Sequence, residues 1–319
     1  MRSNQKALIF GCTGQDGSLM AKSLIEQGIE PIGVSTRKVP NLKNLNYLCI
    51  SGVKIKSIKQ LAVDALIDLI EQIKPIEIYN LSAQSSVGLS FSKVFETFES
   101  ISNQTNTLLE ACKGSNFKGR IFFAGSSEIF GNTKTPATTF TELNPRSPYA
   151  IAKIASMNMV KLYRETYGLK CVTGILFNHE SPLRDERFVT QKIIKGAVQS
   201  SIDKDFKITL GNLNIQRDWG WAEEYVIGMQ KITRARDMKD QILCTGKSIS
   251  LKQFTELAYK KLGLNWKDHV DIKKDYFRPN DIKVSMGDSK SMSKDLNWDA
   301  KIDYNKVIDY LIYHEINSN

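Results

Sequence analysis

The stretch that decides the fold is residues 6–28, KALIFGCTGQDGSLMAKSLIEQG. Residues 6–10 form an apolar run typical of a buried strand, and an amphipathic pattern typical of a helix closes the stretch. Between them lie Gly11, Gly14 and Gly17, spaced GxxGxxG. Such glycines let the backbone turn tightly and approach a pyrophosphate, which the amides and dipole of the helix start attract. A tight turn alone is the other interpretation, but the strand before and the helix after favour a phosphate-binding loop.

Strands and helices continue to alternate from that stretch to about residue 175. Short apolar runs typical of buried strands are separated by amphipathic patterns typical of helices. The expected strands span residues 30–36, 53–58, 76–83, 121–124 and 170–177, and the expected helices span residues 60–73, 94–113 and 149–167. This order predicts the α/β class, with a Rossmann-type doubly wound parallel sheet and right-handed crossovers.

The regular alternation breaks down after residue 175, which suggests two domains. Residues 1–175 are expected to form the dinucleotide-binding Rossmann domain. Residues 176–319 are expected to form mainly a smaller C-terminal α/β lobe that binds substrate, while segments near residues 213–247 pack back on the first domain.

Residues 121–153, IFFAGSSEIFGNTKTPATTFTELNPRSPYAIAK, bring four reactive groups to one surface. Ser126 and Glu128 follow a buried strand, at the edge where ligands of open α/β sheets bind. Tyr149 and Lys153 fall four residues apart on one face of a helix. An ammonium group beneath a phenol stabilises phenolate, so a tyrosine that titrates near pH ~10 can become a base near neutrality. A surface Tyr-Lys pair is the other interpretation of these two residues taken alone.

Composition narrows the class of protein. The five cysteines are scattered without a CxxC pair, which favours reduced thiols in the cytoplasm, and three scattered histidines argue against a metal site. No apolar run approaches the ~20 residues that span a membrane, and no signal segment is evident, so no membrane association is expected. The net charge of +10 comes without a basic arm, so we expect no nucleic-acid partner. Such a charge instead favours a polyanionic small ligand.

Basic residues indicate which anions are bound. Arg37 follows the second expected strand, where an acid would favour the ribose 2′-hydroxyl of NAD and a basic residue accommodates the 2′-phosphate of NADP. The sequence therefore favours NADP. The second half of the chain also contains a group of basic residues. The guanidinium groups of its arginines suit a diphosphate, although each residue alone could form a surface ion pair. They are Arg184, Lys192, Arg217 and Arg278.

Motifs across nearly the whole chain carry a resemblance to a known family. They are GCTGQDGS, YNLSAQSSVGLSF, SSEIFG, RSPYAIAK, YRETYG, GILFNHESPLR, RFVTQKI, LGNLNIQRDWGWAEEYV and RPNDI. Together they resemble the GDP-mannose 4,6-dehydratases, a family of extended short-chain dehydrogenases/reductases. The resemblance implies a tightly held NADP, GDP-mannose as substrate, and GDP-4-keto-6-deoxymannose and water as products of an internal hydride transfer.

The resemblance also implies roles for individual residues. Tyr149 would take the proton of the 4-hydroxyl, and Lys153 would lower the pKa of Tyr149. Ser126 would hydrogen-bond the 4-oxygen. Glu128 would remove the C5 proton and then protonate the departing 6-hydroxyl. Cofactor contacts are implied for Gly11, Thr13, Gly14, Gln15, Asp16, Arg37, Leu81, Ala83, Ser85, Tyr149, Lys153, His179 and Arg184. Substrate contacts are implied for Ser85, Ser126, Glu128, Asn178, Val189, Lys192, Asn212, Arg217, Arg278 and Asp281.

Two departures from the family pattern leave alternatives open. Where relatives place an Asp-Leu pair that holds the adenine, this chain has Lys59 and Gln60. The loop after Arg37 is short, which favours a homodimer through the helix bearing Tyr149 over a homotetramer. The rival functions are a GDP-heptose dehydratase, a reductase or 4-epimerase of the same fold, or a non-catalytic NADP-binding protein. Glu128 argues against the reductase and the epimerase, since neither reaction deprotonates C5.

Overall fold

The computed structural model describes residues 5–58 and 62–317, so Lys59 and Gln60 lie outside the described residues. The chain forms two compact units. The first comprises Met1–Ile129, Ser147–Leu176 and Val226–Gln241, and the second comprises Phe130–Arg146, Phe177–Tyr225 and Ile242–Asn319. Each unit is therefore assembled from three separate stretches of sequence.

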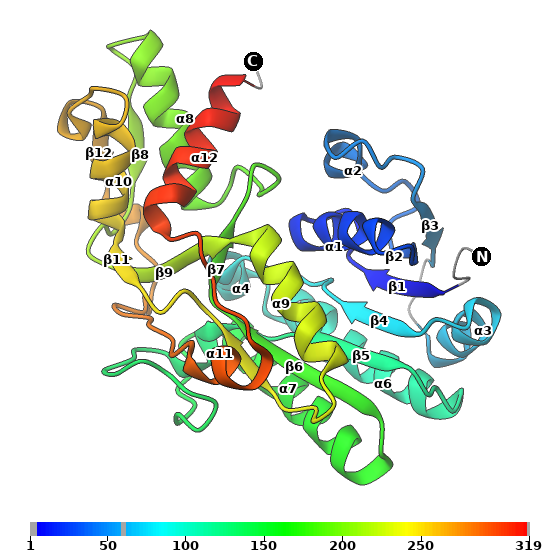
Figure 1. The fold of residues 1–319 in the computed structure, drawn as a ribbon. Coiled ribbons are helices and arrows are strands. Elements are labelled where there is room, and N and C mark those ends of the chain that lie inside the picture. Colours follow the sequence, from blue (N-terminus) through cyan, green and yellow to red (C-terminus); the bar gives the residue numbers. More distant parts are fainter. Residues whose placement is uncertain (1–4, 59–61, 318–319) are drawn as a thin grey trace. The chain divides into compact units, whose positions relative to one another are not determined.

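A seven-stranded sheet forms the framework of the first unit, in the order β10-β6-β5-β4-β1-β2-β3 (Figure 1). Its strands are β1 (Lys6–Phe10), β2 (Glu30–Ser35), β3 (Lys54–Ser57), β4 (Glu77–Asn80), β5 (Arg120–Ala124), β6 (Lys170–Leu176) and β10 (Gln241–Leu243). The pairs from β3 through to β6 are all parallel. The strand order reverses direction between β1 and β4, and ligands of doubly wound sheets bind at the carboxyl ends of the strands at such a switch point.

Helices on both faces bury the sheet. They are α1 (Gln15–Glu26), α2 (Lys43–Tyr47), α3 (Val63–Ile73), α4 (Val87–Ser92), α5 (Val94–Phe98), α6 (Gln104–Gly114), α7 (Pro148–Tyr167) and α9 (Ala222–Arg234). Leu8 and Phe10 of β1 join one core cluster with residues of α3, α6 and α7. Ala7 and Ile9 are equally buried but alternate with them, so they point to the other face. Burial on both faces explains the apolar runs of the inner strands, whereas the edge strand β3, with the sequence KIKS, is largely exposed.

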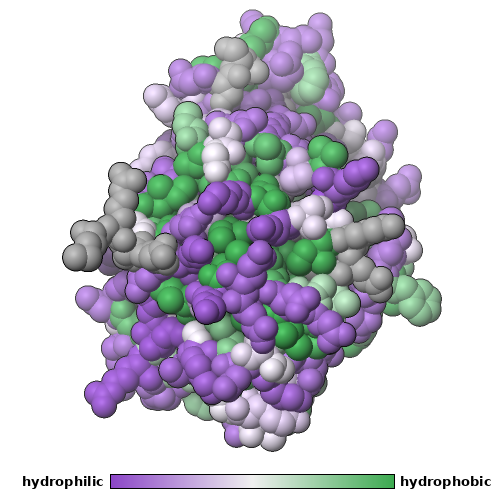
Figure 2. Space-filling view, turned by 90° about the vertical axis from the view of Figure 1, so that its right-hand side faces the viewer, coloured by the Kyte–Doolittle hydropathy of each residue, from purple (hydrophilic) through white to green (hydrophobic). Residues whose placement is uncertain are grey.

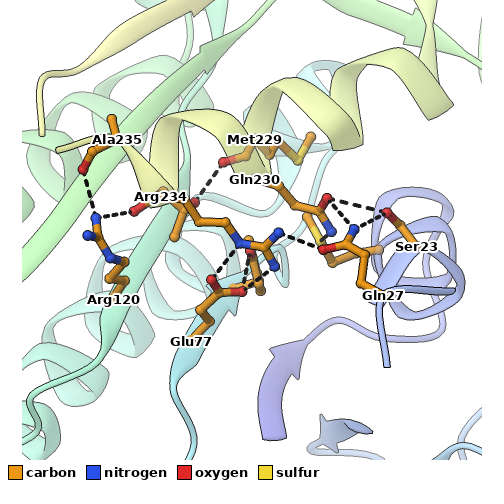
Figure 3. A network of polar contacts seen from close by, with 11 residues as sticks. Ser23, Gln27, Glu77, Arg120, Met229, Gln230, Arg234 and Ala235 are labelled. Atoms are coloured by element: carbon orange, nitrogen blue, oxygen red, sulfur yellow. Dashed lines mark hydrogen bonds and ion pairs between the residues drawn. The ribbon is translucent and has the colours of Figure 1, made fainter. Parts of the chain in front are cut away.

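A polar network fastens α9 to the amino-terminal edge of this sheet (Figure 3). Arg234 binds Glu77 of β4 through two nitrogens, at 2.6 Å and 2.9 Å. Arg120 at the start of β5 donates to the carbonyls of Thr233 and Ala235 at 2.9 Å and 2.8 Å, which satisfies carbonyl groups at the end of the helix. These contacts make Val226–Gln241 part of the first unit, although the segment is distant in sequence from the sheet.

Two small sheets and four helices make up most of the second unit. The three-stranded sheet has the order β11-β9-β7, and the two-stranded sheet pairs β12 with β8. The elements are β7 (Asn178–Glu180), α8 (Val189–Ile202), β8 (Ile208–Leu210), β9 (Gln216–Trp221), β11 (Ser248–Ser250), α10 (Leu251–Lys260), β12 (Val270–Ile272), α11 (Lys290–Leu296) and α12 (Tyr304–Asn317). Their shared core contains Trp219, Phe254 and Tyr259, together with aliphatic residues of α8 and α12.

The predicted fold class is confirmed, but one expected helix is interrupted. Residues 94–113 form α5, a π-helical turn over Glu99–Asn103, and then α6. A π turn inserts an extra residue into a helix and often occurs near a functional site. The short helix α2, in the polar stretch after Arg37, was not predicted.

Among residues 5–58 and 62–317, no helix is both long and apolar enough to cross a membrane. The space-filling view of one face shows hydrophilic residues interspersed among hydrophobic ones (Figure 2).

Candidate functional site

The glycine loop lies at the switch point between β1 and β4. Gly11 has a φ of +82°, and a Cβ built there would approach the backbone nitrogen of Ser82 to 2.8 Å. A Cβ on Gly17 would approach the carbonyl oxygen of Gly11 to 2.1 Å. Both positions therefore require glycine. Gly14 precedes α1, and no side chain caps this 12-residue helix, whose positive dipole end favours an anionic ligand.

The other predicted cofactor residues of the loop lie around that helix start. Thr13, Gln15 and Asp16 are partly exposed, and the Gln15 amide donates to Asp16 at 2.9 Å. Asn44 of the unpredicted helix α2 donates to the carbonyl of Thr13 at 3.1 Å. Helix α2 thus supports the loop.

The carboxyl end of β4 forms the opposite side of the switch point. Leu81 donates to the Phe10 carbonyl at 3.0 Å, which ties the end of β4 to the end of β1. Ala83 packs against Tyr149 and Ile101 in a small apolar cluster. Ser85 is exposed. The π turn holds this segment because Ser100 accepts a hydrogen bond from the Gln84 amide at 3.2 Å.

Ser126 and Glu128 follow β5 as predicted. The Glu128 amide donates to the Ser126 hydroxyl oxygen at 3.3 Å, which closes a short turn within the 3-10 helix Ser127–Phe130. Gly125 makes this turn possible, since a Cβ there would approach Thr173 of β6 to 2.8 Å. Ser126 is buried and Glu128 is partly exposed. Glu128 is thus partly accessible, two residues after a buried serine whose hydroxyl oxygen is held by the Glu128 backbone amide.

Tyr149 and Lys153 lie on the buried face of α7, and both are largely covered. Ser147 caps the helix by accepting from the Ala150 amide at 3.1 Å, and Pro148 occupies its first turn. The Lys153 ammonium lies 5.7 Å from the centre of the Tyr149 ring. It also donates to the carbonyl of Ala124, the last residue of β5, at 2.6 Å. That hydrogen bond joins α7 to β5, the strand that precedes Ser126.

Burial governs the charge state of Lys153. It lowers the pKa of the ammonium from 10.5 to about 8, because the charged form loses its hydration, and the Asp16 carboxylate opposes the shift. Lys153 is therefore mostly protonated at neutral pH, close to the Tyr149 ring.

Arg37 lies just beyond the end of β2, and its side chain is exposed. Its backbone is held on both sides: its amide donates to the Ser35 hydroxyl at 3.1 Å, and its carbonyl accepts from Ser57 at 2.8 Å. The segment thus presents the guanidinium to solvent at the carboxyl edge of the sheet.

In the second unit, His179 and Arg184 lie together. The His179 Nδ1 is 2.7 Å from the Phe177 carbonyl, and the imidazole stacks on Tyr225 with ring centres 4.6 Å apart. Arg184 donates to the His179 carbonyl at 2.5 Å. The two predicted cofactor residues of this unit are therefore directly connected.

The predicted substrate residues of the second unit form two further groups. In the first, the Lys192 ammonium lies 5.2 Å from the Tyr276 ring centre, and Gly211, next to Asn212, lies against the Tyr276 backbone. In the second, buried Arg217 lies 3.4 Å from Asp281 and donates to the Ile282 carbonyl at 2.7 Å.

Three other predicted substrate residues are placed separately. Asn178 begins β7, Val189 begins α8, and Arg278 is exposed in the loop after Tyr276.

Comparison with known proteins identifies the family. The model of the GDP-mannose 4,6 dehydratase family matches residues 8–311. The chain belongs to the GDP-mannose 4,6-dehydratase family. It is 37% identical to GDP-mannose 4,6 dehydratase 1 of Arabidopsis thaliana, over 97% of this chain and 89% of that protein. It is 32% identical to GDP-mannose 4,6 dehydratase of Homo sapiens, over 97% of this chain and 91% of that protein. These matches confirm the predicted dehydratase class and GDP-mannose as its substrate.

Solved structures share the fold at lower sequence identity. UDP-glucose 4-epimerase of Thermotoga maritima, determined with UDP-glucose, has a TM-score of 0.87 at 19% identity, covering 98% of this chain and 99% of that chain. The dTDP-glucose 4,6-dehydratase of Bacillus anthracis, determined with NAD, has a TM-score of 0.85 at 18% identity, covering 98% of this chain and 97% of that chain. At such identities the likeness concerns the fold alone.

Sequence reasoning missed three residues of this dehydratase that lie among the candidates. Tyr276 contacts Lys192 and Gly211, but it ends a 3-10 helix of three residues, Lys274–Tyr276, which is too short to give a periodic signal. Glu180 is fully buried beside Arg184. Ser100 supports the end of β4 only because of the π turn. Among residues 5–58 and 62–317, no group of three His, Cys, Asp or Glu side chains could hold a metal ion.

Proposed function

We propose that this chain converts GDP-mannose into GDP-4-keto-6-deoxymannose and water, with NADP as a recycled cofactor. Family membership supports the reaction. The observation that carries the residue assignment is the turn after β5, where Glu128 stands beside Ser126 in the unit that also contains Tyr149 and Lys153. Oxidation at C4 and elimination across C5 and C6 are separate proton transfers, so they require two separate acid-base groups.

The four residues divide this work. Tyr149 takes the proton of the C4 hydroxyl, and the Lys153 ammonium near its ring favours the phenolate. Ser126 hydrogen-bonds the C4 oxygen and stabilises the carbonyl as it forms. Glu128 removes the C5 proton, which the new carbonyl has made acidic, and protonates the departing C6 hydroxyl. Returning a proton to C5 completes the product, so the net loss is one water.

The first unit fits a nicotinamide dinucleotide. Gly11 leaves space that a Cβ would fill, and the dipole at the start of α1, which no side chain caps, favours a pyrophosphate there. Exposed Arg37 beyond β2 supports NADP over NAD, because a guanidinium suits the 2′-phosphate. The remaining contacts are assigned to Thr13, Gly14, Gln15, Asp16, Leu81, Ala83, Ser85, His179 and Arg184. When bound, the cofactor accepts hydride from C4 and returns it to C6.

The second unit supplies the nucleotide-sugar contacts. The pairs Lys192–Tyr276 and Arg217–Asp281 combine cations with an aromatic ring and a carboxylate, which suits a diphosphate and a nucleoside. Asn178, Val189, Asn212 and Arg278 complete the proposed set. A GDP-heptose is the second candidate substrate, since its nucleotide part is the same.

We also assign a homodimeric, cytoplasmic protein. Ile151 and Leu162 are large apolar side chains exposed on α7, and Phe95 of the neighbouring α5 is 92% exposed. Exposed apolar side chains on neighbouring helices suit burial against a second copy. Sedimentation velocity should report twice the 36.0 kDa chain mass, and Leu162→Glu should shift it to the monomer. A monomeric wild type would refute this assembly.

Incubation of purified protein with GDP-mannose, without added NADPH, tests the function. A 4-keto-6-deoxy product is expected, because the reaction needs no net reductant. Dependence on added NADPH would indicate a reductase, and conversion of a GDP-heptose alone would refute the substrate.

A further inference from the structure

Glu180 is a buried acid that the proposed chemistry does not use. It ends β7 and is 0% exposed. One carboxylate oxygen, Oε2, accepts from the Thr190 hydroxyl at 2.6 Å. The other, Oε1, is buried without a hydrogen-bond donor among the described residues. Because a buried carboxylate with an unsatisfied oxygen costs free energy of folding, packing alone does not account for an acid here.

The cation beside Glu180 is Arg184. Its Nε lies 3.2 Å from Glu180 Oε2 as an ion pair without a hydrogen bond, and its Nη1 donates to the His179 carbonyl at 2.5 Å. The guanidinium also lies over the Phe188 ring, with Cζ 4.1 Å from the ring centre. Three contacts to one planar group restrict its orientation.

The hydrogen bond and the ion pair involve Nη1 and Nε of this guanidinium. A guanidinium carries five N–H donors, so Arg184 has further donors with which to bind an anionic or carbonyl group of a ligand.

We propose that Glu180 is a positioning residue that orients Arg184 for the cofactor, an inference that rests on the cofactor role proposed for Arg184. The carboxylate attracts the Nε side of the guanidinium and so limits the orientations of its remaining donors. Through its bond to the His179 carbonyl, Arg184 also couples Glu180 to the second proposed cofactor residue of this unit. Preorganising a charged donor reduces the conformational entropy that ligand binding must overcome.

Binding of NADPH to cofactor-free protein, measured by the fluorescence of the reduced nicotinamide, tests this coupling. The variants are Glu180→Gln, Arg184→Met and the double variant, and far-UV circular dichroism checks their folding. A hydrogen bond from a charged group corresponds to a change in Kd of about 10- to 100-fold, which is the effect expected for Arg184→Met. Glu180→Gln should raise Kd about tenfold or more, because it leaves Arg184 in place but removes its charged partner.

The double variant separates positioning from a general structural effect. Its Kd should equal that of Arg184→Met within about twofold, since Glu180 acts only through Arg184. It also removes both charges together, so it can fold where Glu180→Gln alone leaves Arg184 without its carboxylate, and a Kd well above that of Arg184→Met would then overturn the positioning role. Glu186→Gln is the matched control: it removes an exposed acid from the same segment and should leave Kd unchanged.

The outcomes distinguish this inference from the function on which it rests. A Glu180→Gln protein that folds and binds NADPH like the wild type, while Arg184→Met binds weakly, would overturn the positioning role alone. Additive effects in the double variant would also overturn it. An unchanged Kd in Arg184→Met would refute the assignment of Arg184 to the cofactor. Failure of the wild type to convert GDP-mannose would refute the proposed function separately.

Discussion

Buried Lys153 makes the stability of this protein depend on pH in a defined direction. Its pKa falls from 10.5 to about 8 on folding, because burial removes hydration from the ammonium. Between these two pH values the unfolded chain binds more protons than the folded chain, so the free energy of unfolding rises with pH. The shift of about 2.5 units corresponds to about 3 kcal/mol, as an order of magnitude.

Comparison with Lys153→Met isolates this contribution, since methionine has a similar length and does not titrate. Urea denaturation of cofactor-free wild type and variant would be followed from pH 7 to pH 10. The wild type should gain about 2 to 3 kcal/mol relative to the variant over that range. Other titrating groups are common to both proteins and cancel. A difference between the two proteins that stays constant with pH would refute the charged, buried state of Lys153.

Three further substitutions, with Lys93→Met as the control for the last of them, test other parts of the structure. Glu128→Gln should lower kcat by about 10²- to 10⁴-fold and let reduced cofactor accumulate, as followed by absorbance, and full dehydration would remove Glu128 from the mechanism. Gly11→Ala should lower the free energy of unfolding in urea by at least about 1–2 kcal/mol and weaken NADPH binding, because the φ of Gly11 is +82°. Unchanged NADPH binding would argue against the cofactor lying against Gly11. Arg234→Met should cost about 3–5 kcal/mol, since it leaves Glu77 buried without its cation. Lys93→Met, which loses only an exposed ion pair, should cost under about 1 kcal/mol, and equal costs would contradict the role of the network.

Local patterns were sufficient to predict most of the sheet of the first unit and α7. The inner strands of the sheet are short apolar runs, and α7 begins with Ser147 and Pro148 and ends at Gly168, which has a φ of +66°. These signals act over a few residues, so a single sequence displays them. The placement of Ser126, Glu128, Tyr149 and Lys153 followed from the same local rules.

Features that depend on distant partners were not predictable. Helix α2 lies in a polar stretch, and its Asn44 finds its partner at Thr13, 31 residues earlier. The π turn is specified by packing against α7, where the Ser102 hydroxyl donates to the Ala152 carbonyl at 3.1 Å. In the second unit, strands of three residues are too short for a periodic signal, and the contact of Glu180 with Thr190 bridges separate elements. Tertiary contacts decide such features.

The central claim is that hydride moves within one sugar while Glu128 exchanges the C5 proton with solvent. Conversion of GDP-mannose deuterated at C4, in ordinary water, tests it when NMR locates the label in the product. The account predicts deuterium at C6, and a parallel reaction of unlabelled substrate in deuterium oxide should place solvent deuterium at C5. Loss of the C4 label to solvent, or a product without deuterium at C5 in the parallel reaction, would contradict the account.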